Sequence, residues 1–288
     1  MSDDLFVTHR GLLFTVAYEM LGSAVDAEDV VQETWLRWAV VNQDEVHNPR
    51  AYLVRIVTRQ ALNRLRSVSR RREEYVGEWL PEPLLTSPDV ADDVELAESV
   101  SIAMLTVLET LGPAERAVFV LHEVFETPYH EIAEAVGRTP AAVRQIAHRA
   151  REHVASRRPR MQVDPAQQQA AVEKFMAAVS TGDVQGLMEV LAPDVVLISD
   201  GGGQVPAARK PITGAGKVVT LLVRGAAMAP DLVMTTAWIN GLPGARIDIG
   251  GTVSAVSLVV EDGRITRIYS IHNPHKLGWL DRVAELRR

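Results

Sequence analysis

Arginine is concentrated in two separate stretches of the sequence. Residues 46–72 hold eight arginines and no acidic residue, and residues 138–160 hold seven arginines and one acidic residue. Lysine first appears at Lys174, so every fixed positive side-chain charge before it is a guanidinium. A guanidinium binds phosphates and guanine edges through two parallel hydrogen bonds, whereas an ammonium acts as a point charge. The clustering favours contact with nucleic acid, although a GC-rich genome would also raise the arginine content.

The second stretch lies in a pattern of three short helices. Pro113 opens the first, residues 129–136 form the second, Gly137 supplies the turn, and Thr139 caps the third helix with Pro140 at its first position. This is the spacing of a helix-turn-helix, whose last helix reads base edges with its N-terminal half. The alternative is an arginine-rich helix end that satisfies only the macrodipole and solvent. We predict DNA contacts from six residues of this segment: Thr139, Arg144, Gln145, His148, Arg149 and Arg151.

The first stretch predicts an amphipathic helix from about residue 50 to residue 67. Apolar side chains such as Leu53 and Val57 follow one stripe, and basic side chains follow another. A basic face with an aromatic ring and an amide suits opening or single-stranded DNA, because phosphates need positive charge and extruded bases need stacking partners. A solvated arginine face is the alternative. The polar face consists of Tyr52, Arg55, Arg59, Asn63 and Arg66.

Residues 26–38, DAEDVVQETWLRW, predict a helix with two different faces. At helical period Val31, Trp35 and Trp38 share one stripe, which we expect to be buried. The other face is polar and acidic, and we expect it to bind a partner. That face carries Asp29, Gln32, Glu33 and Leu36.

The bulk composition excludes several classes of protein. The chain has 288 residues, 47% of them hydrophobic, which is enough for two or three folded domains. It contains no cysteine, so disulfides, thiolate metal sites and cysteine nucleophiles are excluded. No apolar run is long enough for a membrane span and no signal peptide is indicated, so we expect a cytoplasmic protein. The formal net charge of −7 argues against a general nucleic-acid packing protein. The spacing of the histidines predicts no metal site, and we expect no cofactor.

The order of the predicted elements indicates a multidomain protein. Two all-α domains occupy residues 1–75 and 99–160, and an α+β domain occupies residues 161–288. Residues 76–98 lie between the two helical domains, within a run of nine acidic residues and no basic residue at positions 73–98. Three prolines in this segment predict an extended, flexible acidic linker, with helix resuming near Val94. In the α+β domain, Asp262 and Gly263 mark a β-hairpin turn.

The helical segments closely resemble regions two and four of bacterial extracytoplasmic-function (ECF) sigma factors, over about residues 5–158. The similar segments are DAEDVVQETWLRW, AYLVRIVTRQALNRLRS and LGPAERAVFVLHEVF with YHEIAEAVGRTPAAVRQIAHRAREHV. The resemblance implies that the polar face of residues 26–38 binds the β′ clamp helices of core RNA polymerase and that region four contacts the β flap. It also implies that the helix at residues 50–67 captures the minus-ten promoter element and the helix at 140–154 the minus-thirty-five element. Asn63 stands where the family often has Asp, so the minus-ten preference is left open.

Residues 161–288 resemble a SnoaL-like domain of the NTF2-like fold, a cone-shaped α+β fold. Sigma factors with this extension, the SigJ-like group, share three motifs with this chain: Trp79–Pro83, Asp200–Gly203, and Asn273 and Pro274 with Lys276 and Leu277. The resemblance implies that the extension sets sigma activity in place of a separate anti-sigma protein. We assign the regulatory or pocket residues as Asp200, Gly201, Gly202, Gly203, Trp238, His272, Asn273 and Pro274.

Two other functions fit parts of the sequence. An ordinary helix-turn-helix regulator with a ligand-sensing domain would leave the acidic face at residues 26–38 unexplained. A cyclase-like enzyme fused to a DNA-binding module would use Asp200 and His272 as acid and base, with Trp238 as a pocket wall. The glycines after Asp200 fit a tight turn or a docking surface better, and fold resemblance does not transfer function. We therefore predict a sigma factor without catalytic residues, whose C-terminal pocket regulates activity or senses a small-molecule ligand.

Overall fold

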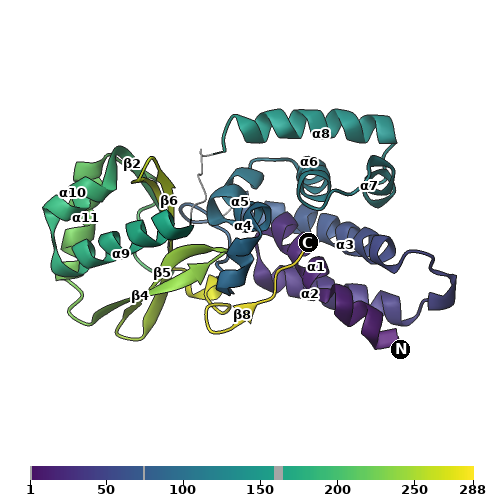
Figure 1. Cartoon of the computed structure of the whole chain (residues 1–288), viewed down its shortest axis with the longest axis horizontal. Coiled ribbons are helices and arrows are strands. Elements are labelled where there is room, and N and C mark those ends of the chain that lie inside the picture. Colours follow the sequence, from purple (N-terminus) through teal and green to yellow (C-terminus); the bar gives the residue numbers. More distant parts are fainter. Residues whose placement is uncertain (1, 74, 159–164) are drawn as a thin grey trace. The chain divides into compact units, whose positions relative to one another are not determined.

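The computed structural model describes residues 2–73, 75–158 and 165–288. The chain divides into two compact units (Figure 1). The first unit comprises residues 1–74, 104–158 and 285–288, and the second comprises residues 75–103 and 159–284. Within the described ranges, every helix falls short of the length or the apolar content that a bilayer crossing requires.

Three helices that pack against one another begin the first unit. α2 starts at a cap, where the hydroxyl of Ser23 accepts a hydrogen bond from the amide of Asp26 at 3.2 Å. At the other end of the chain, the amide of Arg287 donates to the hydroxyl of Thr15 in α1 at 3.0 Å. The elements are α1 (Ser2–Leu21), α2 (Ala24–Ala39), the 3-10 turn η1 (Gln43–Glu45) and α3 (Pro49–Glu73).

The tryptophans of α2 lie in different environments. Trp38 is 1% exposed and belongs to the core of this helical bundle, as predicted, whereas Trp35 is 41% exposed. The prediction that both are buried is therefore wrong for Trp35. The buried stripe of α2 runs through Val30 and Thr34, and Trp35 lies at its edge.

The predicted helix-turn-helix is present in the same unit. Gly137 has the left-handed backbone, with φ of 68° and ψ of 42°, that ends one helix, and the hydroxyl of Thr139 caps the next by accepting from the amide of Ala142 at 3.2 Å. The terminal helix packs on the two helices that precede it. The elements are α5 (Ile102–Leu108), α6 (Pro113–Phe119), the π-helical turn η3 (Val120–Val124), α7 (Tyr129–Val136) and α8 (Pro140–Ala155).

An eight-stranded sheet organises the second unit, in the order β3-β2-β7-β6-β5-β4-β1-β8. The predicted turn between β6 and β7 is present, since Asp262 and Gly263 have positive φ values of 49° and 74°, as a two-residue hairpin turn requires. The strands are β1 (Leu85–Thr86), β2 (Leu191–Asp200), β3 (Ile212–Thr213), β4 (Leu232–Ile239), β5 (Leu242–Ile249), β6 (Thr252–Glu261), β7 (Arg264–Ile271) and β8 (Val283–Ala284). The helical elements are η2 (Pro88–Asp92), α4 (Val94–Val100), α9 (Pro165–Thr181), α10 (Val184–Val190), α11 (Ala215–Ala227) and η4 (Pro274–Lys276).

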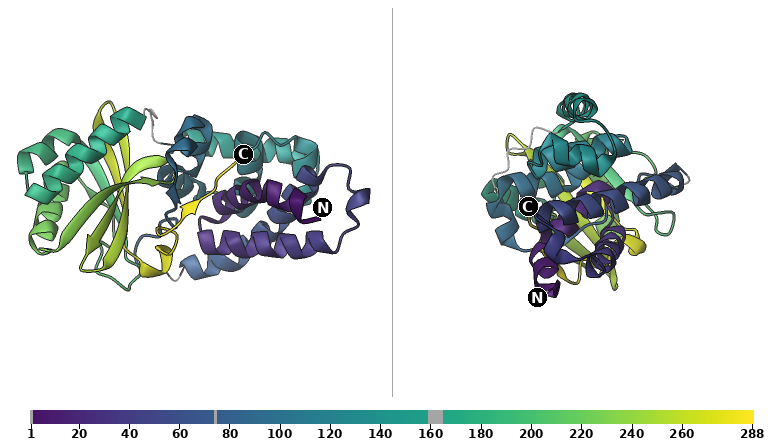
Figure 2. Two further views of the ribbon diagram at one scale, coloured as in Figure 1. Left: turned by 60° about the horizontal axis from the view of Figure 1, so that its bottom comes forward. Right: turned by 90° about the vertical axis from the view of Figure 1, so that its right-hand side faces the viewer.

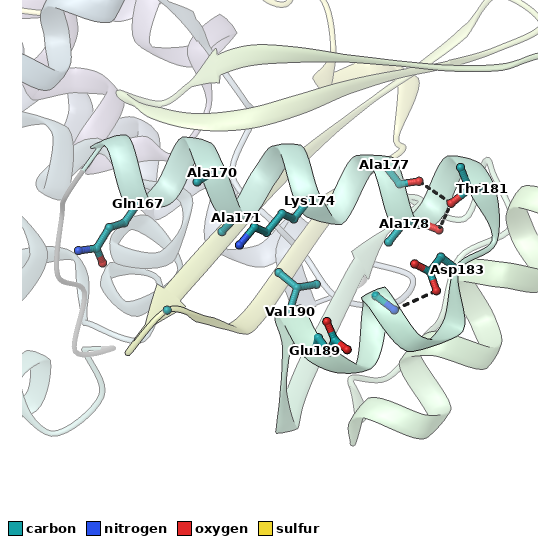
Figure 3. A pocket seen from close by; sticks show the side chains of 12 residues that line it. Gln167, Ala170, Ala171, Lys174, Ala177, Ala178, Thr181, Asp183, Glu189 and Val190 are labelled. Atoms are coloured by element: carbon teal, nitrogen blue, oxygen red, sulfur yellow. Dashed lines mark hydrogen bonds between the residues drawn. The ribbon is translucent and has the colours of Figure 1, made fainter.

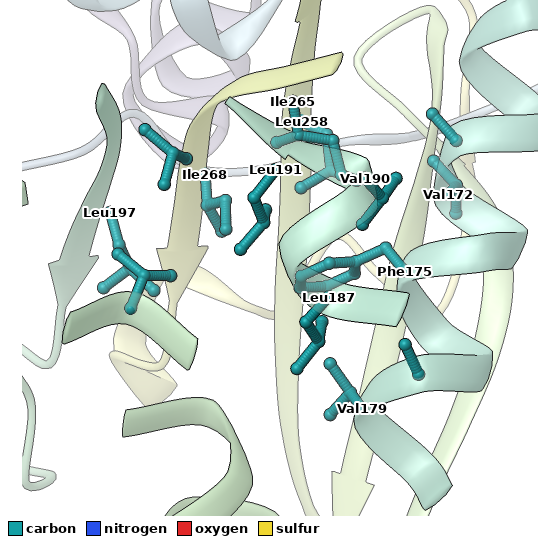
Figure 4. Close-up of a cluster of buried hydrophobic side chains, with 14 of the residues drawn as sticks. Val172, Phe175, Val179, Leu187, Val190, Leu191, Leu197, Leu258, Ile265 and Ile268 are labelled. Atoms are coloured by element: carbon teal, nitrogen blue, oxygen red, sulfur yellow. The ribbon is translucent and has the colours of Figure 1, made fainter. Parts of the chain in front are cut away.

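The two faces of this sheet are covered by different segments. Successive strand residues point to opposite faces, so Leu197 and Ile268 lie on one face while Ile198 and Tyr269 lie on the other. The first face packs against α9, α10 and α11, which cover it as Figure 2 shows, through the cluster drawn in Figure 4. The second face packs against residues of segments 80–103 and 277–280.

The acidic segment that follows α3 is built into the second unit. Leu80 and Leu84 are 1% and 0% exposed, and Leu85 pairs with both β4 and β8. Asp93 caps α4 by accepting a hydrogen bond from the amide of Leu96 at 3.1 Å. The expectation of a flexible, solvated linker is therefore wrong for this segment, because composition cannot show that distant strands bury its leucines. The boundary predicted near residue 160 lies outside the described residues.

Candidate nucleic-acid interface and linker anchor

Helix α8 presents a polar face that is separate from its buried stripe. Val143 and Ala147 are buried against the preceding helices, which turns the opposite side of α8 outward. The exposed His148 ring lies 3.6 Å from Glu152, a pair that stabilises little and that a phosphate can replace. The predicted DNA-contact residues are all exposed: Thr139, Arg144, Gln145, His148, Arg149 and Arg151.

The arginine face of α3 is in contact with α7. Arg55 forms an ion pair with Glu134 at 3.0 Å, and Arg59 donates to the backbone carbonyls of Glu134 at 2.7 Å and Ala135 at 3.4 Å. These carbonyls lie at the C-terminal end of α7, where the helix dipole favours a cation. The ring of Tyr52 packs between Arg55, 5.1 Å from its centre, and Trp38, 5.8 Å away.

The remaining two residues of that face, Asn63 and Arg66, are exposed. The assignment of this face to the minus-ten element stays a prediction. The sequence carried no signal that α7 contacts two arginines of this face, since that contact joins residues more than seventy positions apart.

The outer face of α2 combines acidic and apolar side chains. Gln32, Glu33 and Leu36 are exposed, and Leu36 is 59% exposed beside the exposed Trp35. Asp29 is partly buried and lies 3.2 Å from Arg64 of α3, while Glu33 accepts a hydrogen bond from Gln60 at 2.6 Å. The face is thus fixed to α3 by its acidic side chains and leaves an apolar surface open to a partner.

The carboxylate of Asp200 holds the linker in the second unit. Asp200 is 0% exposed, and its two oxygens accept hydrogen bonds from Tyr75 Oη at 2.6 Å, the Leu80 amide at 2.9 Å and Lys276 Nζ at 2.7 Å. Lys276 also donates to the carbonyl of Leu80, and Asn273 donates to the Tyr75 hydroxyl at 2.7 Å. We call these five residues, Tyr75, Leu80, Asp200, Asn273 and Lys276, the linker anchor.

The linker anchor joins the three motifs that the sequence singled out. Lys276 also lies 4.0 Å from the ring centre of Trp79, so the first motif contacts the third directly. Burial, followed by the hydrogen bond to Asp200, raises the pKa of Tyr75, which keeps its hydroxyl protonated as a donor. Tyr75 lies outside all three motifs, and nothing in the sequence pattern indicated it.

The glycines after Asp200 are required by close packing around the linker anchor. Gly202 has a φ of 58°, and a Cβ on it would lie 2.2 Å from Asn273 Nδ2. A Cβ on Gly201 would lie 2.3 Å from the carbonyl oxygen of Val205. Pro274 begins η4, which Asn273 caps by accepting a hydrogen bond from the amide of His275 at 3.1 Å.

A cavity of about 290 Å³ lies between the first face of the sheet and helices α9 and α11. His272 lines it, with Nδ1 2.8 Å from the hydroxyl of Ser254 and Nε2 2.8 Å from that of Ser270. Burial lowers the pKa of His272, an effect that nearby Asp200 opposes only in part. Neither Asp200 nor Trp238 lines this cavity, which corrects the expectation that they are its acid and its wall; β4 contributes residues nearer its other end.

A larger hollow of about 580 Å³ lies between α9 and α10 (Figure 3). Two of its polar side chains, Asp183 and Thr181, hydrogen-bond to nearby backbone. Asp183 caps α10 by accepting from the amide of Gly186 at 3.0 Å, and the Thr181 hydroxyl donates to the carbonyl of Ala177 at 2.8 Å. We assign no function to this hollow.

Comparison with known proteins supports the helical assignments. Family models of Sigma-70 region 2 and Sigma-70, region 4 match residues 5–71 and 101–154. The chain is 40% identical over 222 residues to the ECF RNA polymerase sigma factor SigJ of Mycobacterium tuberculosis, covering 76% of this chain and 71% of that protein. It is 34% identical over 273 residues to the probable ECF RNA polymerase sigma factor SigI of the same organism, covering 93% and 92%. The crystal structure of M. tuberculosis SigJ matches with a TM-score of 0.77 and 34% identity, covering 96% of this chain and 98% of that one.

Two sigma-70 regions on a helical unit, followed by an α+β unit, define a sigma factor of the sigma-70 class. The chain belongs to the ECF RNA polymerase sigma factor family. The likeness to the SigJ structure extends over nearly the whole chain, so the α+β unit is part of it.

Replacing Lys276 by methionine tests the linker anchor. The variant keeps the apolar stem but leaves the buried carboxylate of Asp200 without its cation. We expect its free energy of unfolding, measured by denaturant titration, to fall by about 3 to 5 kcal/mol. Lys217→Met, on the exposed side of α11, is the matched control and should change it by less than about 0.5 kcal/mol. Equal stability of the two variants would contradict the role of Lys276.

The burial of His272 predicts a pH dependence of stability. Its folded-state pKa lies below the unfolded value of about 6.5, so the unfolded state takes up the proton first. The stability that neutral His272 contributes is therefore fully present above about pH 6.5 and is lost as the pH falls toward the folded-state pKa. Thermal unfolding of the His272→Gln variant should lack this acid-side loss, while the exposed control His130→Gln should retain it. Parallel profiles for all three proteins would refute the prediction.

Proposed function

We propose that this protein is a promoter-recognition subunit that binds core RNA polymerase, recognises minus-thirty-five and minus-ten elements and starts transcription without catalysing a reaction itself. The observation that carries the proposal is the capped turn at Gly137 and Thr139, which presents α8 with its arginine face outward. The ECF sigma factor family supplies the context. A protein with this function works in the cytoplasm, where the polymerase is.

The surfaces described above receive separate roles. Arg144, Gln145 and His148 of α8 would read bases of the minus-thirty-five element, and Thr139, Arg149 and Arg151 would hold its phosphates. The outer face of α2 would bind the β′ clamp helices, with region four on the β flap. The polar face of α3 would bind the minus-ten element.

The minus-ten role sets a structural requirement. Arg55 and Arg59 now contact α7, so α7 must leave α3 before these arginines bind phosphate. Docking on the polymerase would supply that separation, because it gives each region its own partner surface.

The second unit would regulate the sigma regions through the linker. Residues 75–103 join α3 to the helices of region four in the chain, and the linker anchor ties the start of this segment to Asp200. A change in the anchor therefore alters the connection between the two sigma regions. A cyclase-like activity is disfavoured because the carboxylate of Asp200 is committed to these donors and does not line the cavity.

Run-off transcription with purified core polymerase separates the proposed function from that of a ligand-sensing helix-turn-helix regulator. We expect a product from a cognate promoter that depends on this chain. Promoter-specific binding by the chain alone, with no product when polymerase is present, would instead support the regulator.

Substituting Arg144 tests base reading by α8. If Arg144 contacts a guanine edge through two hydrogen bonds, Arg144→Ala should weaken discrimination at the minus-thirty-five element by about 1 to 3 kcal/mol. Competition between promoter DNA and DNA altered in that element measures the effect on the holoenzyme. The control Arg157→Ala, beyond the end of α8, should weaken both DNAs alike. The same uniform loss for Arg144→Ala would show that Arg144 contacts only phosphate.

Reversing the charge of Glu33 tests the partner face of α2. Glu33→Lys should weaken binding to core polymerase at least about tenfold while leaving the melting temperature nearly unchanged, because the side chain is exposed. Glu173→Lys, an exposed position of α9, is the matched control. Unchanged polymerase affinity of Glu33→Lys in a pull-down titration would remove Glu33 from the proposed interface.

A further inference from the structure

The cavity between the sheet, α9 and α11 has an apolar wall and one polar patch. The described residues of its lining include no aspartate, glutamate, lysine or arginine, and most are aliphatic or aromatic, including Phe175, Leu222 and Met234. The polar patch consists of the neighbouring side chains Ser199, Ser254, Ser270 and His272. A charged ligand would lose its hydration here without gaining a counter-charge, so the lining selects neutral molecules.

The histidine of this patch leaves hydrogen-bonding capacity unused. A neutral imidazole has one N–H donor and one acceptor nitrogen, so one of Ser254 and Ser270 donates to the ring while the other accepts from it. The accepting serine keeps its own O–H group for another acceptor, and the donating serine keeps lone pairs for another donor. Burial lowers the pKa of His272 and so favours this neutral state. The patch can therefore bind either a hydroxyl or a carbonyl group.

Ser199 adds an unused group to the patch. It lies beside Ser270 on the adjacent parallel strand, is 6% exposed and lines the cavity. Among the described residues, its hydroxyl has no hydrogen-bond partner. Because Ser199 lines the cavity, this hydroxyl is available to form a hydrogen bond with a ligand or a water molecule there.

The volume limits the size of the ligand. A cavity of about 150 Å³ accommodates benzene, so one of about 290 Å³ accommodates roughly twelve non-hydrogen atoms. We propose that this cavity binds a neutral, mainly apolar small molecule of that size, whose single hydroxyl or carbonyl group hydrogen-bonds to the Ser199 hydroxyl within the polar patch.

The site deepens the proposed regulatory function, and its effect on transcription rests on that function. Ser199 and His272 line the cavity, and the residues that follow them, Asp200 and Asn273, belong to the linker anchor. A ligand that shifts the ends of β2 and β7 therefore acts on groups one residue away from the linker contacts. Binding itself needs neither polymerase nor DNA.

Calorimetric titration of the full chain with three matched probes tests the site. The probes are 1-naphthol, an aromatic alcohol of about the right size, naphthalene, which lacks the hydroxyl, and 1-naphthoate, which is charged. We expect saturable binding of 1-naphthol at one site per chain, naphthalene about three- to tenfold weaker, and 1-naphthoate at least about tenfold weaker. Tighter binding of 1-naphthoate than of 1-naphthol would overturn the proposal, as would the absence of saturable binding, which would leave water as the only occupant.

Two pairs of variants locate the binding. Ala226→Phe fills the cavity from α11 and should abolish binding, whereas Ala227→Phe, exposed and outside the lining, should not. Ser199→Ala should reduce 1-naphthol affinity to that of naphthalene without changing naphthalene affinity, whereas Ser257→Ala, buried on β6 outside the lining, should change neither. Equal binding by Ala226→Phe and the wild type, or no effect of Ser199→Ala, would overturn the proposal.

The binding result is independent of the proposed function. Failure to bind the probes refutes the ligand site while run-off transcription is unaffected. Failure of run-off transcription refutes the sigma role while the calorimetric result still stands.

Discussion

The buried ion pair of Asp200 and Lys276 constrains the path of the linker. Removing a carboxylate and an ammonium from water costs several kcal/mol per ion, which mutual attraction offsets only when further hydrogen bonds satisfy both groups. Here Tyr75 and the Leu80 amide supply two of those bonds. The linker therefore provides hydrogen bonds that replace water around the buried ion pair. The linker therefore cannot leave this position without exposing or unpairing a buried charge. The proline and acidic content of the linker suggests a flexible segment, but its hydrogen bonds to Asp200 hold it in the folded second unit.

The pleat of the sheet places this constraint next to the cavity. Residue 199 points to the face that α9 and α11 cover, and residue 200 points to the face that holds the linker; residues 272 and 273 divide in the same way. The glycines at 201 and 202 allow the chain to turn tightly at the end of β2, where a Cβ would overlap Val205 or Asn273. The ends of β2 and β7 therefore place polar side chains on both faces of the sheet, one toward the cavity and the next toward the linker. Asp200, the acid of the cyclase-like alternative, instead accepts hydrogen bonds that hold the linker.

Local signals in the sequence predicted local structure, and contacts between distant residues were not visible in it. Pro113, Gly137 and Thr139 act through backbone geometry and capping, so the helix-turn-helix and the turn at Asp262 could be predicted from neighbouring residues. The burial of Leu80 depends on strands more than a hundred residues away, and proline and acidic content misled the prediction there. The helical period shows which residues share one side of α2, but it does not show which residues lie at the middle of the buried side. Trp35 was therefore assigned to the core although it lies at the edge of that side. The motifs around Asp200 were recognised as important, but their mutual contacts required the fold.

The contacts inside the first unit differ greatly in strength. The ion pair of Arg55 with Glu134 is solvent-exposed, and such pairs contribute about 0 to 1 kcal/mol, so phosphates of DNA can compete for Arg55. Arg116 of α6 is in the opposite situation: it is 1% exposed, pairs with Glu109 and donates to the carbonyl of Glu19 in α1 at 2.8 Å. Separating α6 from α1 would break the bond to Glu19 and alter the surroundings of a buried guanidinium. Arg116 therefore makes a buried contact between regions two and four, whereas the contact of Arg55 with α7 is a solvent-exposed ion pair that an anion can replace.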